Sequence, residues 1–169
     1  MAEGKVLVVM GSDSDFPVME GCFKMLNKFG VEFEADVASA HRTPQRAHEL
    51  AITAEEKGFK VIIAAAGLAA HLAGVLAANT TLPVIGVPCK GGALNGVDAL
   101  YATVQMPTGI PVATVAIDGG SNAAILACQI LALSDVKLSQ ALKEYKKSLA
   151  DSVTERDARL KQKISCMEK

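Results

Sequence analysis

The stretch KVLVVMGSDSD, residues 5–15, decides the fold. Its first six residues form a nearly uninterrupted apolar run, which is typical of a strand buried on both faces of a sheet. Apolar side chains then follow at helical spacing over residues 16–26, with Ser14 or Asp15 as the expected N-cap and Gly30 as the expected end of the helix. A buried strand, a polar loop and a helix in this order predict an alternating α/β chain.

The same alternation continues as far as residue 133. The expected further strands are residues 31–39, 60–67, 83–88 and 112–117, and the expected further helices are residues 44–57, 70–78 and 123–133. Strands and helices at this spacing predict the α/β class, in which helices cover both faces of a parallel sheet. Five strands joined by right-handed crossovers favour a flavodoxin-like three-layer αβα sandwich, formed by residues 1–134.

The last 35 residues, 135–169, differ in composition, since 15 of them are charged. Apolar side chains recur there in steps of three or four, at Leu138, Leu142, Tyr145, Leu149 and Val153. This spacing predicts a long amphipathic helix of the same domain, which packs across the domain or onto a neighbouring subunit. Beyond Arg156 the apolar stripe thins, and we expect that end to fray.

Residues 61–134 carry only three charged side chains, Lys90, Asp98 and Asp118. At average composition about a quarter of such a stretch would be charged. Glycine and proline interrupt every segment that is long enough to cross a membrane, so a membrane protein is not expected. We expect instead that much of this surface is buried against other copies of the chain, in a homo-oligomer.

Composition excludes several other classes of protein. A formal charge of −1 and a pI of about 6.3 argue against a protein that binds nucleic acid through a basic face. The four cysteines form no CxxC pair, which argues against a disulfide framework or a zinc site and favours a reducing, cytoplasmic location. The histidines and carboxylates lack metal-ligand spacing, and no nucleotide-binding motif occurs, so we expect neither a metal nor a cofactor.

Three loops that follow strands carry the residues suited to chemistry, because ligands collect where the strands of a parallel sheet end. The first loop is residues 11–15. The hydroxyls of Ser12 and Ser14 lie at a helix N-terminus, which favours a phosphate. Asp15 could instead accept hydrogen bonds from sugar hydroxyls, and ordinary capping of the helix is the alternative for the whole loop.

The second loop, residues 39–44, places Ser39 and Ala40 before His41 and Arg42. Arg42 offers a rigid fork that suits a phosphate, and His41 can give and take a proton near neutral pH. The alternative for His41 is a structural hydrogen bond to a backbone carbonyl.

The third loop, residues 64–71, has small side chains that let a ligand approach the backbone and leave a tight apolar niche. His71 could be structural or catalytic there. His48, in contrast, lies among residues of ordinary polarity in a predicted helix and is interpreted as a surface residue.

Five motifs in collinear order carry a resemblance: GSDSD (11–15), SAHRTP (39–44), AGLAAHLAG (66–74), ALNGVDALYATVQMPTGIPV (93–112) and NAAILACQILA (122–132). Together they resemble the N5-carboxyaminoimidazole ribonucleotide mutase family of purine biosynthesis over roughly residues 5–140. The resemblance implies a homo-octamer of flavodoxin-like catalytic domains. It also implies rearrangement of that ribonucleotide to 4-carboxy-5-aminoimidazole ribonucleotide without a metal or nucleotide cofactor.

The resemblance also implies roles for individual residues. His41 would be the proton carrier, and Ser12, Asp15 and Arg42 would bind substrate. Ser14, Ser39 and Ala40 would assist around the phosphate and ribose. The loop from Gly67 through Leu68 and Ala70 to His71 would line the base and a carbon dioxide niche, which Ala65, Ala66 and Ala69 would help to wall.

Three positions depart from the family. The family commonly has glycine where this chain has Leu68, proline where it has Ala73, and a serine in the segment where it has Gly91 and Gly92. Leu68 would narrow the niche or shift its loop.

Two alternatives to the mutase stay open. The sister branch, 5-aminoimidazole ribonucleotide carboxylase, uses free carbon dioxide and typically has lysine after the loop histidine and a Gly-Arg-Ser-Asn loop. Arg42 and the sequence Gly-Leu-Ala-Ala at residues 67–70 favour the mutase instead. A protein that senses a phosphate ligand without turnover is the second alternative.

Overall fold

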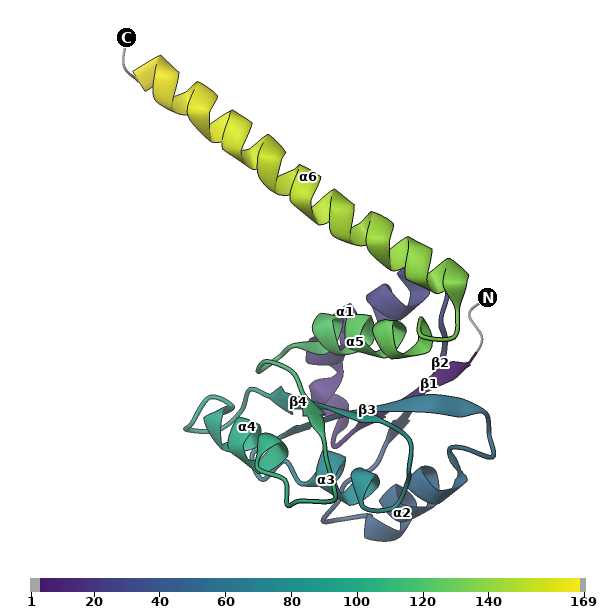
Figure 1. Cartoon of the computed structure of the whole chain (residues 1–169). Coiled ribbons are helices and arrows are strands. Elements are labelled where there is room, and N and C mark those ends of the chain that lie inside the picture. The colour runs from purple at the N-terminus through teal and green to yellow at the C-terminus, as the bar shows by residue number, and fades with distance from the viewer. Residues whose placement is uncertain (1–3, 168–169) are drawn as a thin grey trace.

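Five parallel strands form a single sheet in the computed structural model, which describes residues 4–167 (Figure 1). The strands are β1 (Lys5–Met10), β2 (Glu32–Val37), β3 (Phe59–Gly67), β4 (Val84–Cys89) and β5 (Ala113–Thr114). They lie in the order β2-β1-β3-β4-β5, and every neighbouring pair is parallel. The predicted flavodoxin-like sandwich is therefore confirmed.

The last strand is shorter than the six residues that the sequence predicted. β5 lies at the edge of the sheet and pairs with β4 over only two residues. Further along, Val115 and Asp118 each donate one backbone N–H to a β4 carbonyl, at 3.0 and 2.9 Å. With a neighbour on one side only and a positive φ of 58° at Asp118, the chain leaves the regular ladder early.

Helices cover both faces of the sheet (Figure 1). On one face α1 (Phe16–Lys28) and α5 (Gly120–Leu131) pack together, and on the other lie α2 (Pro44–Thr53) and α3 (Leu72–Ala77). A short turn of 3-10 helix, η1 (Asp13–Asp15), precedes α1, and α4 (Val97–Val104) packs against β4 and β5.

Some helix bounds differ from those predicted. No helix was predicted at α4. The expected helix 44–57 ends at Thr53, where the N–H of Ala54 bonds to the Ala51 carbonyl at 3.4 Å, three residues back. Turns follow as far as Gly58, whose φ is +84°. The expected helix 70–78 is α3 alone, since tight turns occupy the residues before Leu72.

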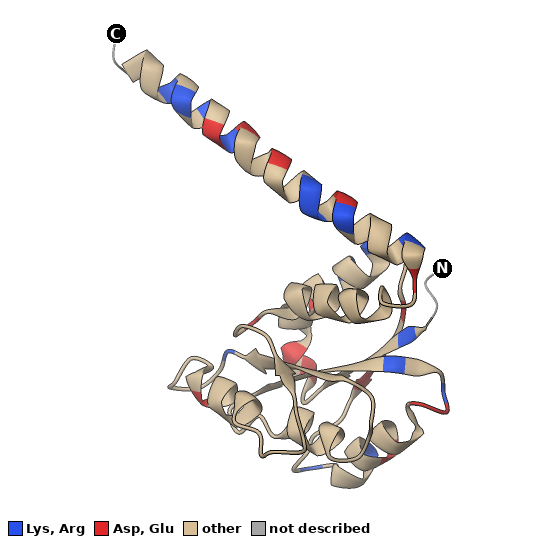
Figure 2. Cartoon of the chain, viewed as in Figure 1, with Lys and Arg blue, Asp and Glu red and all other residues tan. Residues whose placement is uncertain are grey.

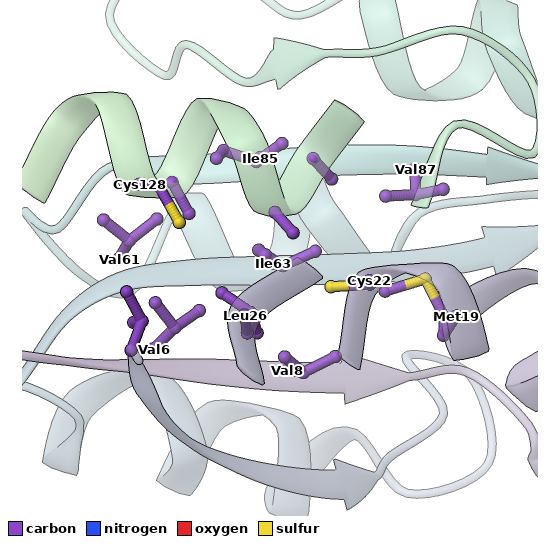
Figure 3. Packing of buried hydrophobic residues seen from close by; sticks show 14 of the residues in the cluster. Val6, Val8, Met19, Cys22, Leu26, Val61, Ile63, Ile85, Val87 and Cys128 are labelled. Carbon is purple, nitrogen blue, oxygen red and sulfur yellow. The ribbon is translucent and has the colours of Figure 1, made fainter. Parts of the chain in front are cut away.

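The core between the sheet and the α1/α5 layer is built from small and branched side chains (Figure 3). Strand residues such as Val8 and Ile63 meet Met19 and Leu26 of α1 and Cys128 of α5. The two helices approach so closely that an added methyl group at Gly120 would lie 2.5 Å from the Val18 carbonyl oxygen. Alanine, cysteine and glycine at these positions therefore permit the dense packing.

The C-terminal helix α6 (Val136–Met167) projects away from the sandwich (Figure 1). Only its beginning packs on the domain, where Leu138 is buried and Tyr145 meets Phe29 edge-on at 5.5 Å. The expected fraying beyond Arg156 is not seen. Instead the helix continues to Met167, and ion pairs between residues four apart, such as Lys161–Asp157 at 2.7 Å, support its far half.

Charge is distributed unevenly over the molecule (Figure 2). Lysine, arginine, aspartate and glutamate recur along α6, whereas α3 and α5 carry none. Large apolar side chains are exposed on and before α4, including Leu94 and Tyr101, which is 61% exposed. Within residues 4–167, no helix combines the length and the apolar content that a membrane span requires.

Candidate active site

The loops that follow β1, β2, β3 and β4 enclose a cavity of about 540 Å³ at the carboxyl edge of the sheet. Ten of the eleven predicted site residues line it: Ser12, Ser14, Asp15, Ser39, Ala40, His41, Arg42, Gly67, Leu68 and His71. Ala70 does not, because its side chain turns into the core and is only 1% exposed. Ala65 is likewise buried, so of the alanines at residues 64–70 only Ala66 and Ala69 line the cavity.

The first loop is held by a reciprocal cap. The Ser12 hydroxyl accepts the N–H of Ser14 at 3.3 Å, and the Asp15 carboxylate accepts the N–H of Ser12 at 3.0 Å. Asp15 occupies the N-cap position of α1, as predicted, but its side chain makes no capping hydrogen bond to α1. The side chain that caps the short helical turn before α1 is that of Ser12. Burial raises the pKa of Asp15, and hydrogen bonds from the N–H groups of Ser12 and Gly11 oppose that rise.

The second loop is braced by its own hydroxyls. Ser39 accepts the N–H of Arg42 at 3.2 Å, and the Thr43 hydroxyl accepts the N–H of Ser39 at 2.9 Å. Pro44 then begins α2. Within residues 4–167 the Arg42 guanidinium has no ion-pair partner, although it lines the cavity. A rigid loop therefore presents a free cationic fork to a ligand.

Two histidines meet across the cavity. The Nε2 atom of His41 lies 2.8 Å from the Nδ1 atom of His71, and the two rings are edge to face with centroids 4.9 Å apart. In a neutral pair one ring donates the shared hydrogen and the other accepts it, so each ring orients the other. His41 is thus bonded to an imidazole and not to the backbone carbonyl considered as the alternative. His48 lies outside the cavity, exposed on α2, with its Nδ1 atom 2.9 Å from Asn79 Oδ1.

The third loop makes two tight turns between β3 and α3. The N–H of Ala70 bonds to the Leu68 carbonyl at 2.9 Å, and the N–H of His71 bonds to the Ala69 carbonyl at 2.8 Å. Leu68 has a positive φ of 54°, which is uncommon for a residue with a side chain. These turns carry His71 to the first turn of α3, where it faces His41.

The comparison with known proteins decides the family, because the AIR carboxylase family model matches residues 5–152. The chain belongs to the AIR carboxylase family. It is 59% identical to the N5-carboxyaminoimidazole ribonucleotide mutase of Pyrococcus abyssi, over 86% of this chain and 83% of that protein. It is 51% identical to the mutase of the same name from Thermotoga maritima, over 94% and 92%. The crystal structure of Treponema denticola PurE superposes with a TM-score of 0.82 at 30% identity, over 92% of this chain and 97% of that one.

In this member of the AIR carboxylase family a fourth loop, residues 90–92, completes the cavity. Sequence reasoning gave Lys90 no role, although its isolation as the one cation of residues 61–134 was a usable signal. The N–H of Lys90 bonds to the Asp118 carboxylate at 2.8 Å, which anchors the loop. Gly11 and Leu72 also line the cavity and were not predicted to do so.

Nothing in the cavity provides a nucleophilic thiol. Burial, and then the negative charges of Asp15 and Asp118, raise the pKa of Cys89 to about 12, so this thiol stays protonated near neutral pH. Over the described part of the chain, no group of three or more histidine, cysteine or acidic side chains is placed to hold a metal ion. The titratable side chains that face the cavity are Asp15, His41, Arg42, His71 and Lys90.

Proposed function

We propose that the protein is an isomerase of purine biosynthesis that converts N5-carboxyaminoimidazole ribonucleotide to 4-carboxy-5-aminoimidazole ribonucleotide. The observation that carries this proposal is the imidazole pair, His41 and His71, in a cavity that also holds an unpaired guanidinium and a wall of small residues. The names of the relatives from Pyrococcus abyssi and Thermotoga maritima agree with the activity. The site residues and their roles are part of the proposal.

The phosphate and ribose of the substrate would bind at the first two loops. The Arg42 guanidinium supplies charge and two parallel donors for a phosphate, and the helix N-terminus beside it supplies further donors. The Ser14 hydroxyl donates to Ser12 Oγ at 2.9 Å, and it would turn from there to the phosphate. Asp15 is held by the N–H of Ser12, which leaves the rest of its carboxylate to accept hydrogen bonds from ribose hydroxyls. The Ser39 hydroxyl accepts the N–H of Arg42, which would hold Arg42 in place, and its own O–H would donate to the phosphate or ribose.

The reaction balances with a single proton carrier. Cleavage of the carbamate N–C bond releases carbon dioxide and returns the bonding electron pair to the nitrogen, which must gain a proton. A carbon atom of the substrate's own imidazole ring then bonds to carbon dioxide, and that carbon must lose its proton. His41 would give the first proton and take the second, so the cycle needs no net acid, oxidant or cofactor. His71, at 2.8 Å, would orient the His41 ring and compensate its change of charge.

Carbon dioxide must stay in the site between the two steps. Ala66, Gly67 and Ala69 line the cavity that His41 and His71 also line, and we infer that their small side chains leave an apolar recess there. Such a recess would hold the gas next to the ring carbon at a high effective concentration and keep it from bulk water.

The test compares two substrate supplies. The mutase should form product from the carbamate at low bicarbonate, and should form little from 5-aminoimidazole ribonucleotide with bicarbonate. Equal or faster product formation from the second supply would show a carboxylase that uses free carbon dioxide. Binding of the ribonucleotide without product formation from either substrate would indicate the second alternative, a protein that senses a phosphate ligand without turnover.

A homo-oligomer, most simply the octamer that the family resemblance implies, is the proposed assembly, and the cytoplasm is the proposed location. The support is the exposed apolar side chains around α4 and those on the projecting α6, where Leu149 is 49% exposed and Val153 63% exposed. Residues 1–134 would form the catalytic sandwich, and residues 135–169 would link subunits.

A further inference from the structure

Leu68 occupies a backbone conformation that favours glycine, with a φ of +54°. Its side chain lines the cavity and is 55% exposed. A leucine in the left-handed region costs free energy that a glycine there would not, because its Cβ crowds the following carbonyl. The surroundings of the leucine side chain must therefore offset that cost.

Those surroundings are the glycine loop after β4. An added methyl group at Gly92 would lie 2.7 Å from the Leu68 Cδ2 atom, and one at Gly91 would lie 4.0 Å from it. The isobutyl group of Leu68 thus packs beside the backbone of Gly92, in a space that a side chain at residue 92 would fill. Lys90, held by Asp118 at 2.8 Å, fixes the loop on which it rests.

The contact joins two of the four loops that enclose the cavity. Leu68 belongs to the loop that carries Ala69 and His71, and Gly92 belongs to the loop that follows β4. The leucine side chain therefore bridges the loops that follow β3 and β4. Its neighbours in the chain, Gly67 and Ala69, also line the cavity.

We propose that Leu68, seated on Gly92, is a positioning residue that closes the carbon dioxide recess and limits escape of the gas before it is recaptured. This inference rests on the proposed mutase function and deepens it. The apolar side chain blocks the passage between the two loops, so carbon dioxide released beside His41 reacts at the ring carbon more often than it leaves.

The experiment follows an isotopic label in the carboxyl group of the carbamate substrate, in buffer that contains unlabelled bicarbonate. Product made from gas that never left the cavity keeps the label, and product made after exchange loses it. For Leu68→Ala we expect the ratio of lost to retained label to rise, because the side chain that limits escape of carbon dioxide is removed. Ile52→Ala, which trims an equally exposed aliphatic side chain on α2 outside the cavity, should leave the ratio unchanged.

Two further variants separate the side chain from the backbone. Leu68→Gly removes the side chain and also relieves the left-handed conformation, so its label loss should match that of Leu68→Ala if the side chain is the cause. Gly92→Ala should raise label loss by displacing the leucine, and circular dichroism would show whether it stays folded.

The possible outcomes test the role of Leu68 and the proposed mutase activity separately. If the unmodified protein forms no product from the carbamate, both the function and the inference are wrong. If it forms product, and Leu68→Ala retains the label as the parent does, the function stands and the inference is overturned. Label loss from Leu68→Gly alone would also overturn it, since the backbone and not the side chain would then be responsible.

Discussion

Arg42 and Arg46 are two arginines in similar places, and only one of them lines the cavity. Both lie near the start of α2, but Arg42 lines the cavity without an ion pair, whereas Arg46 bonds to Asp36 at 2.7 Å outside it. Loss of the free guanidinium should remove charge-assisted hydrogen bonds to a phosphate, each of which contributes about 1.5–3 kcal/mol.

We therefore expect Arg42→Ala to weaken binding of the product ribonucleotide by about tenfold to a hundredfold, which is the change in affinity that corresponds to the loss of one such hydrogen bond. Calorimetric titration measures this directly, with Arg46→Ala as the control that should bind nearly as the parent does. Equal affinity in the Arg42 variant would refute its role at the phosphate.

Asp15 either binds the ligand or only caps the helical turn, and the effect of its charge on stability distinguishes the two roles. Because its pKa is raised, the folded state holds the proton more tightly than the unfolded state. The contribution of this group to stability is therefore full below the pKa of an unfolded aspartate and is lost as pH rises through the raised pKa of the folded state. A carboxylate kept half-buried at neutral pH is therefore a cost to stability, which a role in ligand binding would explain.

For Asp15→Asn we expect a product affinity lower by about tenfold, since hydrogen bonds from ribose hydroxyls to a charged acceptor are lost. The melting temperature near neutral pH should stay the same or rise. In the parent protein, affinity should decline as pH falls, beginning above the pH at which an ordinary aspartate is protonated. A lower melting temperature with unchanged affinity would instead indicate a capping residue only.

The packing of α1 against α5 depends on the absence of side chains. A methyl group at Gly120 would lie 2.5 Å from the Val18 carbonyl oxygen, a backbone atom that cannot rotate away. Gly120→Ala should lower the free energy of unfolding by about 1–3 kcal/mol, as overpacked cores do. Chemical denaturation measures this, and Asn122→Ala, at an exposed position of the same helix, is the control. A stability equal to that of the parent would show that the two helices shift apart freely.

Elements with strong local patterns were predictable, and those that depend on neighbours were not. The run at residues 5–10 is apolar throughout, and β1 occupies those residues. The sequence does not predict α4, because its eight residues follow a left-handed Gly96 and no side-chain cap marks their start. β5 was overestimated because hydropathy does not reveal that an edge strand has one neighbour only.

In the candidate site, too, features set by local sequence were predictable and features set by neighbouring elements were not. The loops after three strands were located from their residue types, since parallel topology brings strand ends together. Within a tight turn, however, successive side chains point in unrelated directions, so Ala69 and the buried Ala70 could not be told apart. The contact between His41 and His71, which are 30 residues apart, depends on the exact path of two loops.

The molecule as a whole presents more apolar surface than a lone sandwich of this size needs. Tyr101 and Leu94 are exposed near α4, and Val153 is 63% exposed on the projecting part of α6. Patches of this kind mark interfaces between proteins, and a helix that leaves its own domain has room to pack on another copy.

We expect sedimentation at micromolar concentration to show one stable oligomer, most simply an octamer. Val153→Asp should shift this species toward smaller assemblies, because a charge would be buried at the interface. Lys147→Ala, on the same helix, should not. A parent protein that sediments as a monomer would contradict the proposed assembly.

The mutase mechanism rests on one imidazole that gives a proton to nitrogen and takes one from carbon. The most direct measurement compares His41→Asn with the parent in two assays, product formation from the carbamate and binding of the product ribonucleotide. The amide of asparagine preserves hydrogen bonding but cannot transfer protons, so turnover should fall by about a hundredfold to ten-thousandfold while affinity stays nearly intact. A variant that converts the carbamate at a rate close to that of the parent would contradict the mechanism.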